Sequence, residues 1–198
     1  MQFITQAVIR GWAIILLAVL LVVTAASLFT AQINPQYRST SQLIVVPNKQ
    51  VEDARNVLRS LETLERRTIV ATYARIPPQK NTIDAAAKQL NINPTALTAY
   101  SIRSTVVPNT NIIRIDVEGI NPATTAAVAN ALARSTSDIA KDIYRIYDLR
   151  LLSEAQPAAN PVRPNWSRNI LISIILGLGL GVLTAIGVES FRARCSEK

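Results

Sequence analysis

Two long stretches without a charged residue lie near the two ends of this 198-residue chain. The first covers the 27 positions after Arg10, and the second covers the 20 positions after Arg168. Both are mostly aliphatic, and a helix of about 20 apolar residues is long enough to cross the hydrocarbon core of a bilayer. The sequence therefore predicts two transmembrane helices, at residues 12–33 and 168–189.

Each stretch has an alternative interpretation. The first lies where a cleaved signal peptide would lie, and a weak cleavage site is present near Ala31. Its apolar run is, however, longer than the roughly 7–15 residues usual for a signal peptide. The second would be a buried helix of a soluble domain, but a domain of this size cannot enclose a helix that is apolar on every side. We expect both helices to remain in the membrane.

Basic residues in the short flanking segments indicate the orientation, because such residues are enriched on the cytoplasmic side of a membrane. Arg10 precedes the first helix, and Arg192 and Arg194 follow the second. Both termini are therefore predicted to be cytoplasmic, in a two-pass protein of the cytoplasmic (inner) membrane. The predicted division is a cytoplasmic N-terminus at 1–11, membrane helices at 12–33 and 168–189, an extracytoplasmic domain at 34–155, a Pro-rich connector at 156–167 and a cytoplasmic tail at 190–198.

The composition excludes several kinds of chemistry. The chain has no histidine and a single cysteine, so it has no Ser-His-Asp triad, no His-ligated zinc and no internal disulfide. Its 21 Lys and Arg residues exceed its 13 Asp and Glu residues by 8, a balance that often indicates nucleic-acid binding. However, 16 of the 21 basic residues lie in the segment predicted to be outside the cytoplasm, so we expect no nucleic-acid partner.

The carboxylates do not form a recognisable catalytic site. Asp138 and Asp142 are four residues apart in a predicted helix, and Asp116 and Glu118 share one face of a predicted strand. Each pair is interpreted as a solvated face, because no suitable nucleophile accompanies it. Glycine is also too sparse outside the second apolar stretch to form a phosphate-binding loop. The sequence predicts a protein that is not an enzyme and has no cofactor or metal.

The predicted extracytoplasmic domain contains both strand and helix patterns. Ile113, Ile115 and Val117 alternate with charged residues, as expected for a half-buried antiparallel strand. Helices and hairpins without regular strand–helix–strand alternation favour an α+β fold with an antiparallel or mixed sheet. The predicted strands cover 36–46, 100–107, 112–118 and 149–155, and the predicted helices cover 51–74, 81–90, a short segment from 93, and 121 to about 147.

Four arginines, Arg55, Arg59, Arg66 and Arg67, form a basic stripe on the first predicted helix of this domain. One interpretation is a solvated face or a contact with a neighbouring subunit. The other is a contact with an anionic glycan or a lipid-linked pyrophosphate, because the planar guanidinium group matches phosphate geometry. The sequence leaves both interpretations open.

The segment that leads into the second apolar stretch is rich in proline. Pro157, Pro161 and Pro164 remove backbone donors and favour a stiff, extended connector. Gly177 and Gly181 form a GxxxG motif within the following helix, and their missing side chains let two helix backbones approach closely. We expect the connector to tie the domain to a closely packed membrane helix.

This layout resembles the Wzz-type chain-length determinants, also called polysaccharide co-polymerases. The first membrane stretch leads into the strand YRSTSQLIV, with Tyr37 near its start. Residues 106–133, VVPNTNIIRIDVEGINPATTAAVANALA, are similar to the family's strand, turn and Asn-Pro-capped helix. The run EAQPAANPVRP is similar to its Pro-rich approach to the membrane, and the second membrane helix has the expected Gly-rich face.

The resemblance implies a non-enzymatic scaffold that forms a cyclic homo-oligomer and sets the length of a surface or capsular polysaccharide made by a separate polymerase. Lipid-linked glycan and membrane lipid are further expected partners. The long coiled-coil extension of many members is missing, so the domain is expected to be compact and close to the membrane. The residues implied to couple the helices and to face the polymerase are Pro157, Pro161, Pro164, Gly177 and Gly181.

Two other functions stay open. Compact members of the family partner tyrosine autokinases. No kinase domain follows the second helix here, so a kinase would be a separate chain that docks on Phe191, Arg192 and Arg194. The other alternative is a two-helix membrane sensor, which the nine residues at 190–198 disfavour because a sensor usually continues into a sizeable output module.

Overall fold

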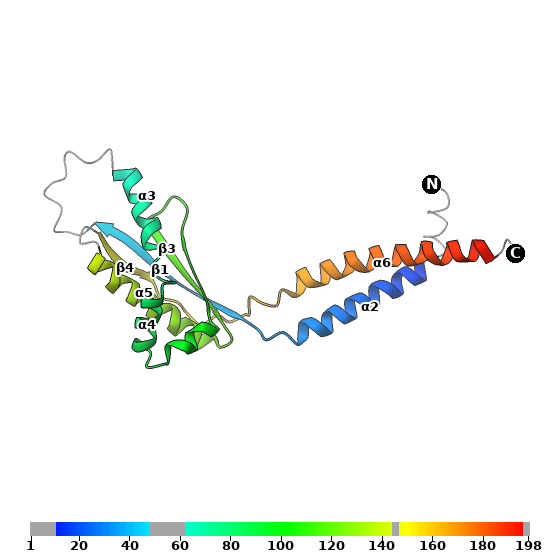
Figure 1. The fold of residues 1–198 in the computed structure, drawn as a ribbon, viewed down its shortest axis with the longest axis horizontal. Coiled ribbons are helices and arrows are strands. Elements are labelled where there is room, and N and C mark those ends of the chain that lie inside the picture. The colour runs from blue at the N-terminus through cyan, green and yellow to red at the C-terminus, as the bar shows by residue number, and fades with distance from the viewer. Residues whose placement is uncertain (1–10, 48–61, 144–146, 196–198) are drawn as a thin grey trace. The chain divides into compact units, whose positions relative to one another are not determined.

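The computed structural model describes residues 11–47, 62–143 and 147–195. The chain divides into two compact units (Figure 1). The helical unit contains the segment up to Asn34 and the segment from Arg163 onward, whereas the α+β unit contains Pro35–Val162. Each unit has its own internal packing.

Two helices, α2 (Trp12–Ala31) and α6 (Trp166–Cys195), form the helical unit. Both are long and apolar enough to cross a membrane, in α6 over Trp166–Val188. Large apolar side chains on their outward faces stay exposed, including Leu20 at 65% and Leu183 at 68%. A continuous exposed apolar surface of this kind is unfavourable in water and suits contact with lipid tails.

The α+β unit is built on a four-stranded sheet. Its strands are β1 (Tyr37–Pro47), β2 (Ser101–Val106), β3 (Ile112–Gly119) and β4 (Tyr147–Ser153). They lie in the order β2-β3-β1-β4, and every neighbouring pair is antiparallel. The predicted α+β fold with an antiparallel sheet is therefore confirmed. Although β1 comes first in the chain, it lies in the interior of the sheet.

Asn-Pro pairs start two of the helical segments, as the sequence predicted. The Asn93 side chain accepts a hydrogen bond from the N–H of Thr95, and the Asn121 side chain accepts one from the N–H of Ala123, both at 3.0 Å. These caps satisfy amide groups that the first turn of a helix leaves unpaired. The described segments are α3 (Glu62–Tyr73), α4 (Lys80–Gln89), the 3-10 helix η2 (Pro94–Ala99) and α5 (Pro122–Ile143).

Some element boundaries differ from the prediction. The last strand begins at Tyr147 rather than at residue 149, because Tyr147 pairs with Pro47 at the end of the ladder between β1 and β4. Helix α5 is described as far as Ile143, and residues 144–146 of the predicted helix lie outside the described residues. Of the helix predicted at 51–74, the part before α3 lies outside the described residues.

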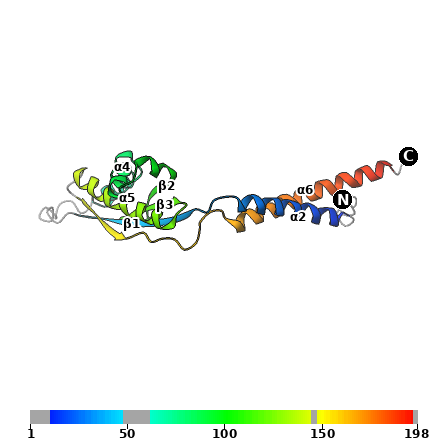
Figure 2. The same cartoon turned by 90° about the horizontal axis from the view of Figure 1, so that it is seen from below.

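The core of the unit lies between one face of the sheet and α5, and α4 packs against α5 (Figure 2). Ile113, Ile115 and Val117 of β3 are fully buried on this face, in agreement with their alternation in the sequence. Alanines on α5 let its backbone lie close to the sheet, so that the Ser41 hydroxyl donates to the carbonyl oxygen of Ala129 at 3.0 Å.

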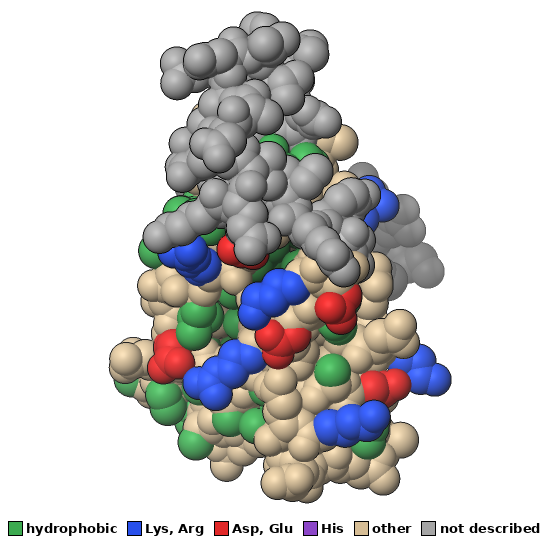
Figure 3. Space-filling view, turned by 90° about the vertical axis from the view of Figure 1, so that its left-hand side faces the viewer, with side chains coloured by type: hydrophobic (Ala, Val, Ile, Leu, Met, Phe, Trp, Pro, Cys, Tyr) green, Lys and Arg blue, Asp and Glu red, His purple; other side chains and the backbone are tan. Residues whose placement is uncertain are grey.

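The opposite face of the sheet carries paired polar side chains. Arg38 and Glu118 are register partners, and Arg38 Nε lies 2.9 Å from Glu118 Oε1. Two residues along, Thr40 Oγ1 donates to Asp116 Oδ1 at 2.6 Å. Glu118 is only 6% exposed, so the prediction of a solvated carboxylate was wrong, because strand pairing brings it beside Arg38. Elsewhere on the unit, acidic and basic side chains are interspersed over an exposed face (Figure 3).

Ile115→Ala is expected to lower the free energy of unfolding by about 2–5 kcal/mol, because the side chain is fully buried and its loss leaves a cavity. Arg114→Ala, at the neighbouring exposed position of β3, is the matched control and should change it by less than about 0.5 kcal/mol. Both values are measured by chemical denaturation of the full chain in lipid nanodiscs, followed by circular dichroism. Equal losses in the two variants would contradict the placement of the core.

Candidate functional site: the helix contact and the connector

The helices α2 and α6 touch along a face of α6 that is built from small residues. A Cβ atom at Gly177 would lie 2.8 Å from the Cα atom of Val19, and one at Gly181 would lie 2.9 Å from the Cα atom of Ile15. Real Cβ atoms do not approach other atoms this closely, and the atoms they would meet belong to the helix backbone. The GxxxG motif is therefore the place where the two helices meet backbone to backbone.

The small-residue face of α6 extends beyond the motif. Ser173 and Ala185 are also buried, and with the two glycines they recur at every fourth residue. Gly179 lies on another face and has nothing within 4 Å of an added Cβ atom. The GxxxG motif alone predicts the two glycines of this face. The two other members, Ser173 and Ala185, can be found from the four-residue spacing of small residues.

A hydrogen bond joins the helices near the start of α6. Asn169 Nδ2 donates to Thr30 Oγ1 at 3.2 Å, and Thr30 is only 3% exposed. Contacts made later along α6 involve earlier residues of α2, such as Ile15, so the two helices are antiparallel. A polar contact of this kind between helices in an apolar environment contributes roughly 0.6–2 kcal/mol.

Hydrogen bonds fasten the start of the connector to the α+β unit. The Asn130 side chain of α5 accepts from the N–H of Ala155 at 2.7 Å and donates to the carbonyl oxygen of Ala155 at 3.0 Å. Further along, the N–H of Val162 donates to the carbonyl oxygen of Gln36 at 2.7 Å. The chain segments that enter and leave this unit therefore lie side by side at Gln36 and Val162.

The three prolines of the connector lie in different environments. Pro157 and Pro161 are exposed and lie between the attachments at Ala155 and Val162. Pro164 belongs to the helical unit, is partly buried, and follows a cis peptide bond. Proline has no N–H to donate, so attachment of the connector depends on other residues, namely Ala155 and Val162.

The other predicted contact residues lie at the margins of the described chain. Arg66 and Arg67 belong to α3, and Phe191, Arg192 and Arg194 belong to the last turns of α6. For these five residues the structure describes the helical backbone, so their contacts stay predictions. Two further members of the basic stripe, Arg55 and Arg59, lie outside the described residues.

The chemistry that this arrangement supports is packing and positioning. Backbone contact at two glycines holds the helix pair, and paired hydrogen bonds hold the connector at its start. Within residues 11–47, 62–143 and 147–195, no group of three His, Cys, Asp or Glu side chains is placed to hold a metal ion.

The fold is similar to that of a solved polysaccharide co-polymerase. A solved "full-length bacterial polysaccharide co-polymerase" superposes with a TM-score of 0.53, covering 96% of this chain and 97% of that chain at 10% sequence identity. At this identity the similarity concerns the fold alone. In the sequence, residues 1–90 match the family model of Wzz, the chain length determinant protein.

Relatives of this chain are named for capsule formation. The capsular polysaccharide biosynthesis protein CpsC of Streptococcus pneumoniae is 27% identical over 179 residues, which cover 89% of this chain and 77% of that protein. The capsular polysaccharide biosynthesis protein CapA of Staphylococcus aureus is 28% identical over 173 residues, which cover 86% and 76%. The predicted resemblance to the Wzz-type chain-length determinants is confirmed.

Gly177→Val or Gly181→Val is expected to separate α2 from α6, because the new side chain would overlap the α2 backbone. Pairing of the two helices is measured with the double substitution Thr30→Cys and Asn169→Cys, at two positions whose parent side chains are hydrogen-bonded. The measured quantity is the rate at which the two new cysteines form a disulfide. After cleavage at a protease site engineered between β2 and β3, only a disulfide keeps the two fragments together on a gel. The rate should fall by at least about fivefold.

Gly179→Val is the matched control for this experiment, because the position has open space around it and should keep the parental rate. All variants carry Cys195→Ser, so that the natural thiol does not compete. If Gly179→Val slows the reaction as much as the other two, the helices do not pair through the GxxxG face.

Proposed function

We propose that this chain is a non-enzymatic, oligomeric membrane scaffold that regulates the chain length and export of a surface or capsular polysaccharide, together with a separate polymerase. The observation that carries the proposal is the match to the chain length determinant family, joined to relatives named for capsular polysaccharide biosynthesis. The fold similarity to a polysaccharide co-polymerase supports it. The lack of histidine supports a role without catalysis, because the common acid–base residue is missing.

The contacts within the helical unit favour a coupling role for Gly177 and Gly181 inside one chain. Since α2 occupies the face of α6 that carries these glycines, a partner helix would meet α6 on its other faces. Gly179 and Gly187 lie on such faces, with nothing within 4 Å of an added Cβ atom. We therefore assign the contact with the polymerase to the outward faces of α6.

Pro157, Pro161 and Pro164 have a coupling role as well, along the connector. Because proline restricts the backbone, the connector resists bending between its attachments and α6. A stiff link of this kind transmits a displacement of Ala155 or Val162 along the chain toward α6. Contact of a glycan with the α+β unit is thereby coupled to the membrane helix that meets the polymerase.

In this account the chain forms a cyclic homo-oligomer in the cytoplasmic membrane, with both termini in the cytoplasm and the α+β unit outside. Lipid-linked glycan and membrane lipid are its further partners. The basic stripe is a proposed contact for that glycan or for a neighbouring subunit. Docking of a separate tyrosine kinase on the end of α6, and a sensor function, gain no support from the names of the relatives.

Deletion of the gene is expected to change the length distribution of the surface polysaccharide while leaving the composition of its repeat unit unchanged, because the chain does no chemistry on the sugar. The distribution is measured by gel electrophoresis of extracted polysaccharide. Complementation with the parental gene should restore the parental distribution, whereas complementation with Gly181→Val should not. An unaltered distribution after deletion would rule out the proposed function.

The lone cysteine, Cys195, tests the proposed topology because it lies at the end of α6. A membrane-impermeant maleimide should label it in inverted membrane vesicles and leave it unlabelled in intact cells. Ser101→Cys in a Cys195→Ser background is the control, since Ser101 is exposed on β2 and should show the opposite pattern. Labelling of Cys195 from outside would contradict the orientation.

A further inference from the structure

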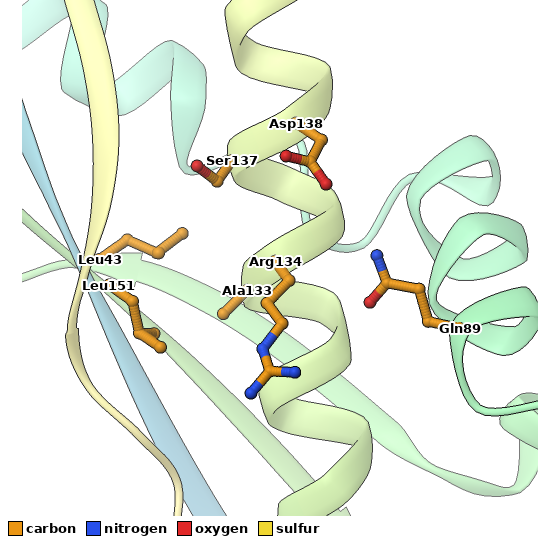
Figure 4. Close-up of a pocket in the computed structure, with 7 residues that line it drawn as sticks. All are labelled: Leu43, Gln89, Ala133, Arg134, Ser137, Asp138 and Leu151. Atoms are coloured by element: carbon orange, nitrogen blue, oxygen red, sulfur yellow. The ribbon is translucent and has the colours of Figure 1, made fainter.

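An open cleft crosses α5 in the α+β unit (Figure 4). Its volume is about 530 Å³, which lies within the range of small-molecule binding sites. A second cavity of about 250 Å³ adjoins it, and both are lined by Gln89 and Arg134. The lining of the larger cavity includes Leu43 of β1, Leu151 of β4, Gln89 of α4, and Arg134, Ser137 and Asp138 of α5.

The α5 wall of the cleft is held in place by contacts with β4 and with the segment after it. Ser137 Oγ donates to the carbonyl oxygen of Leu149 at 2.6 Å, and Arg134 Nη2 lies 3.1 Å from Glu154 Oε1. With Asn130, which bonds to Ala155, these residues form one face of the helix. The cleft is therefore preformed, so a ligand does not have to order this wall.

The charges around the cleft balance each other. Arg134 pairs with Glu154, and Lys141 Nζ lies 3.4 Å from Asp138 Oδ1. These four side chains are all more than half exposed. The cleft therefore offers exposed donors and acceptors at its edge without an excess of either charge.

This balance favours a neutral polyhydroxylated ligand over an anion. A phosphate or carboxylate would have to displace Glu154 from Arg134 and would approach a second carboxylate at Asp138. A sugar hydroxyl instead donates to a carboxylate and accepts from a guanidinium or amide group. The C–H surface of a sugar ring can also pack on Leu151, whose side chain is partly exposed.

We propose that this cleft binds a short neutral segment of a glycan, whose hydroxyl groups donate hydrogen bonds to Asp138 and accept them from Gln89 and Arg134. The proposal rests on the proposed function, which brings a polysaccharide to this unit, and adds the place and the chemical character of the contact. A neighbouring subunit is the competing occupant. The exposed charged lining favours the glycan, because charged residues are depleted at the centre of subunit interfaces.

The test uses the full chain in lipid nanodiscs and measures binding of oligosaccharides of one to three repeat units, cleaved from the surface polysaccharide of the cells that carry this chain. Gln89→Trp adds a bulky side chain at a residue that lines both cavities and should abolish binding. Lys88→Trp is the matched control, because Lys88 is the neighbouring exposed residue of α4 and is not part of the lining; it should bind as the parent does.

A second pair of variants keeps the test independent of a bulky substitution. Asp138→Ala should weaken binding about tenfold through loss of a charged hydrogen-bond acceptor, whereas Asp142→Ala, one turn further along α5, should bind as the parent does. Binding of a neutral segment should also change less than about twofold between low and high salt, because no ion pair with the ligand is screened.

Four results would overturn the inference. These are no binding by the parent, parental binding by both Gln89→Trp and Asp138→Ala, a steep loss of affinity with salt, and a change of oligomeric state in Gln89→Trp, which would assign the cleft to a subunit contact. Deletion of the gene tests the proposed function separately. If deletion changes the polysaccharide length while the oligosaccharides do not bind, the proposed function stands and only the cleft proposal fails.

Discussion

The backbone contact between α2 and α6 is the interaction on which the remaining structure depends. Two apolar helices gain little from the hydrophobic effect by pairing in lipid, because lipid tails are as apolar as their side chains. Close packing at Gly177 and Gly181, with the hydrogen bond between Thr30 and Asn169, supplies the attraction instead. The α+β unit lies between these two helices in the sequence. Its chain must therefore start at the end of α2 and come back to the beginning of α6, which packs against α2.

The sheet of the α+β unit meets this requirement through the place of β1. An interior strand pairs on both sides, and here β1 pairs with β3 and with β4. The segment after β4 then runs back to Gln36, where Val162 is hydrogen-bonded. The same returning segment is fastened to α5 at Asn130, so one polar face of that helix holds both the connector and the wall of the cleft. The hydrogen bonds that hold the returning segment in place are therefore also the contacts on which the proposed coupling to α6 depends.

Much of this arrangement could be predicted from the sequence, because local residue patterns indicate the helices and strands. The apolar stretches predict the helix pair, and the alternation of Ile113, Ile115 and Val117 predicts a half-buried strand. Contacts between distant parts of the chain were not predictable in this way. Glu118 is buried only because strand pairing places it beside Arg38, and Asn130 meets Ala155 only because β4 returns past α5. The facing positions on α2, Ile15 and Val19, carry no small-residue signal because the glycines lie on α6 alone.

We propose that this chain controls the length of a glycan without doing chemistry on it. The most direct measurement reconstitutes the polymerase and its lipid-linked substrate in liposomes, with and without this chain, and compares the length distributions of the products. We expect no polymer from the chain and substrate alone, and a shift of the polymerase products to a defined length range when the chain is present. Identical distributions with and without the chain would contradict it.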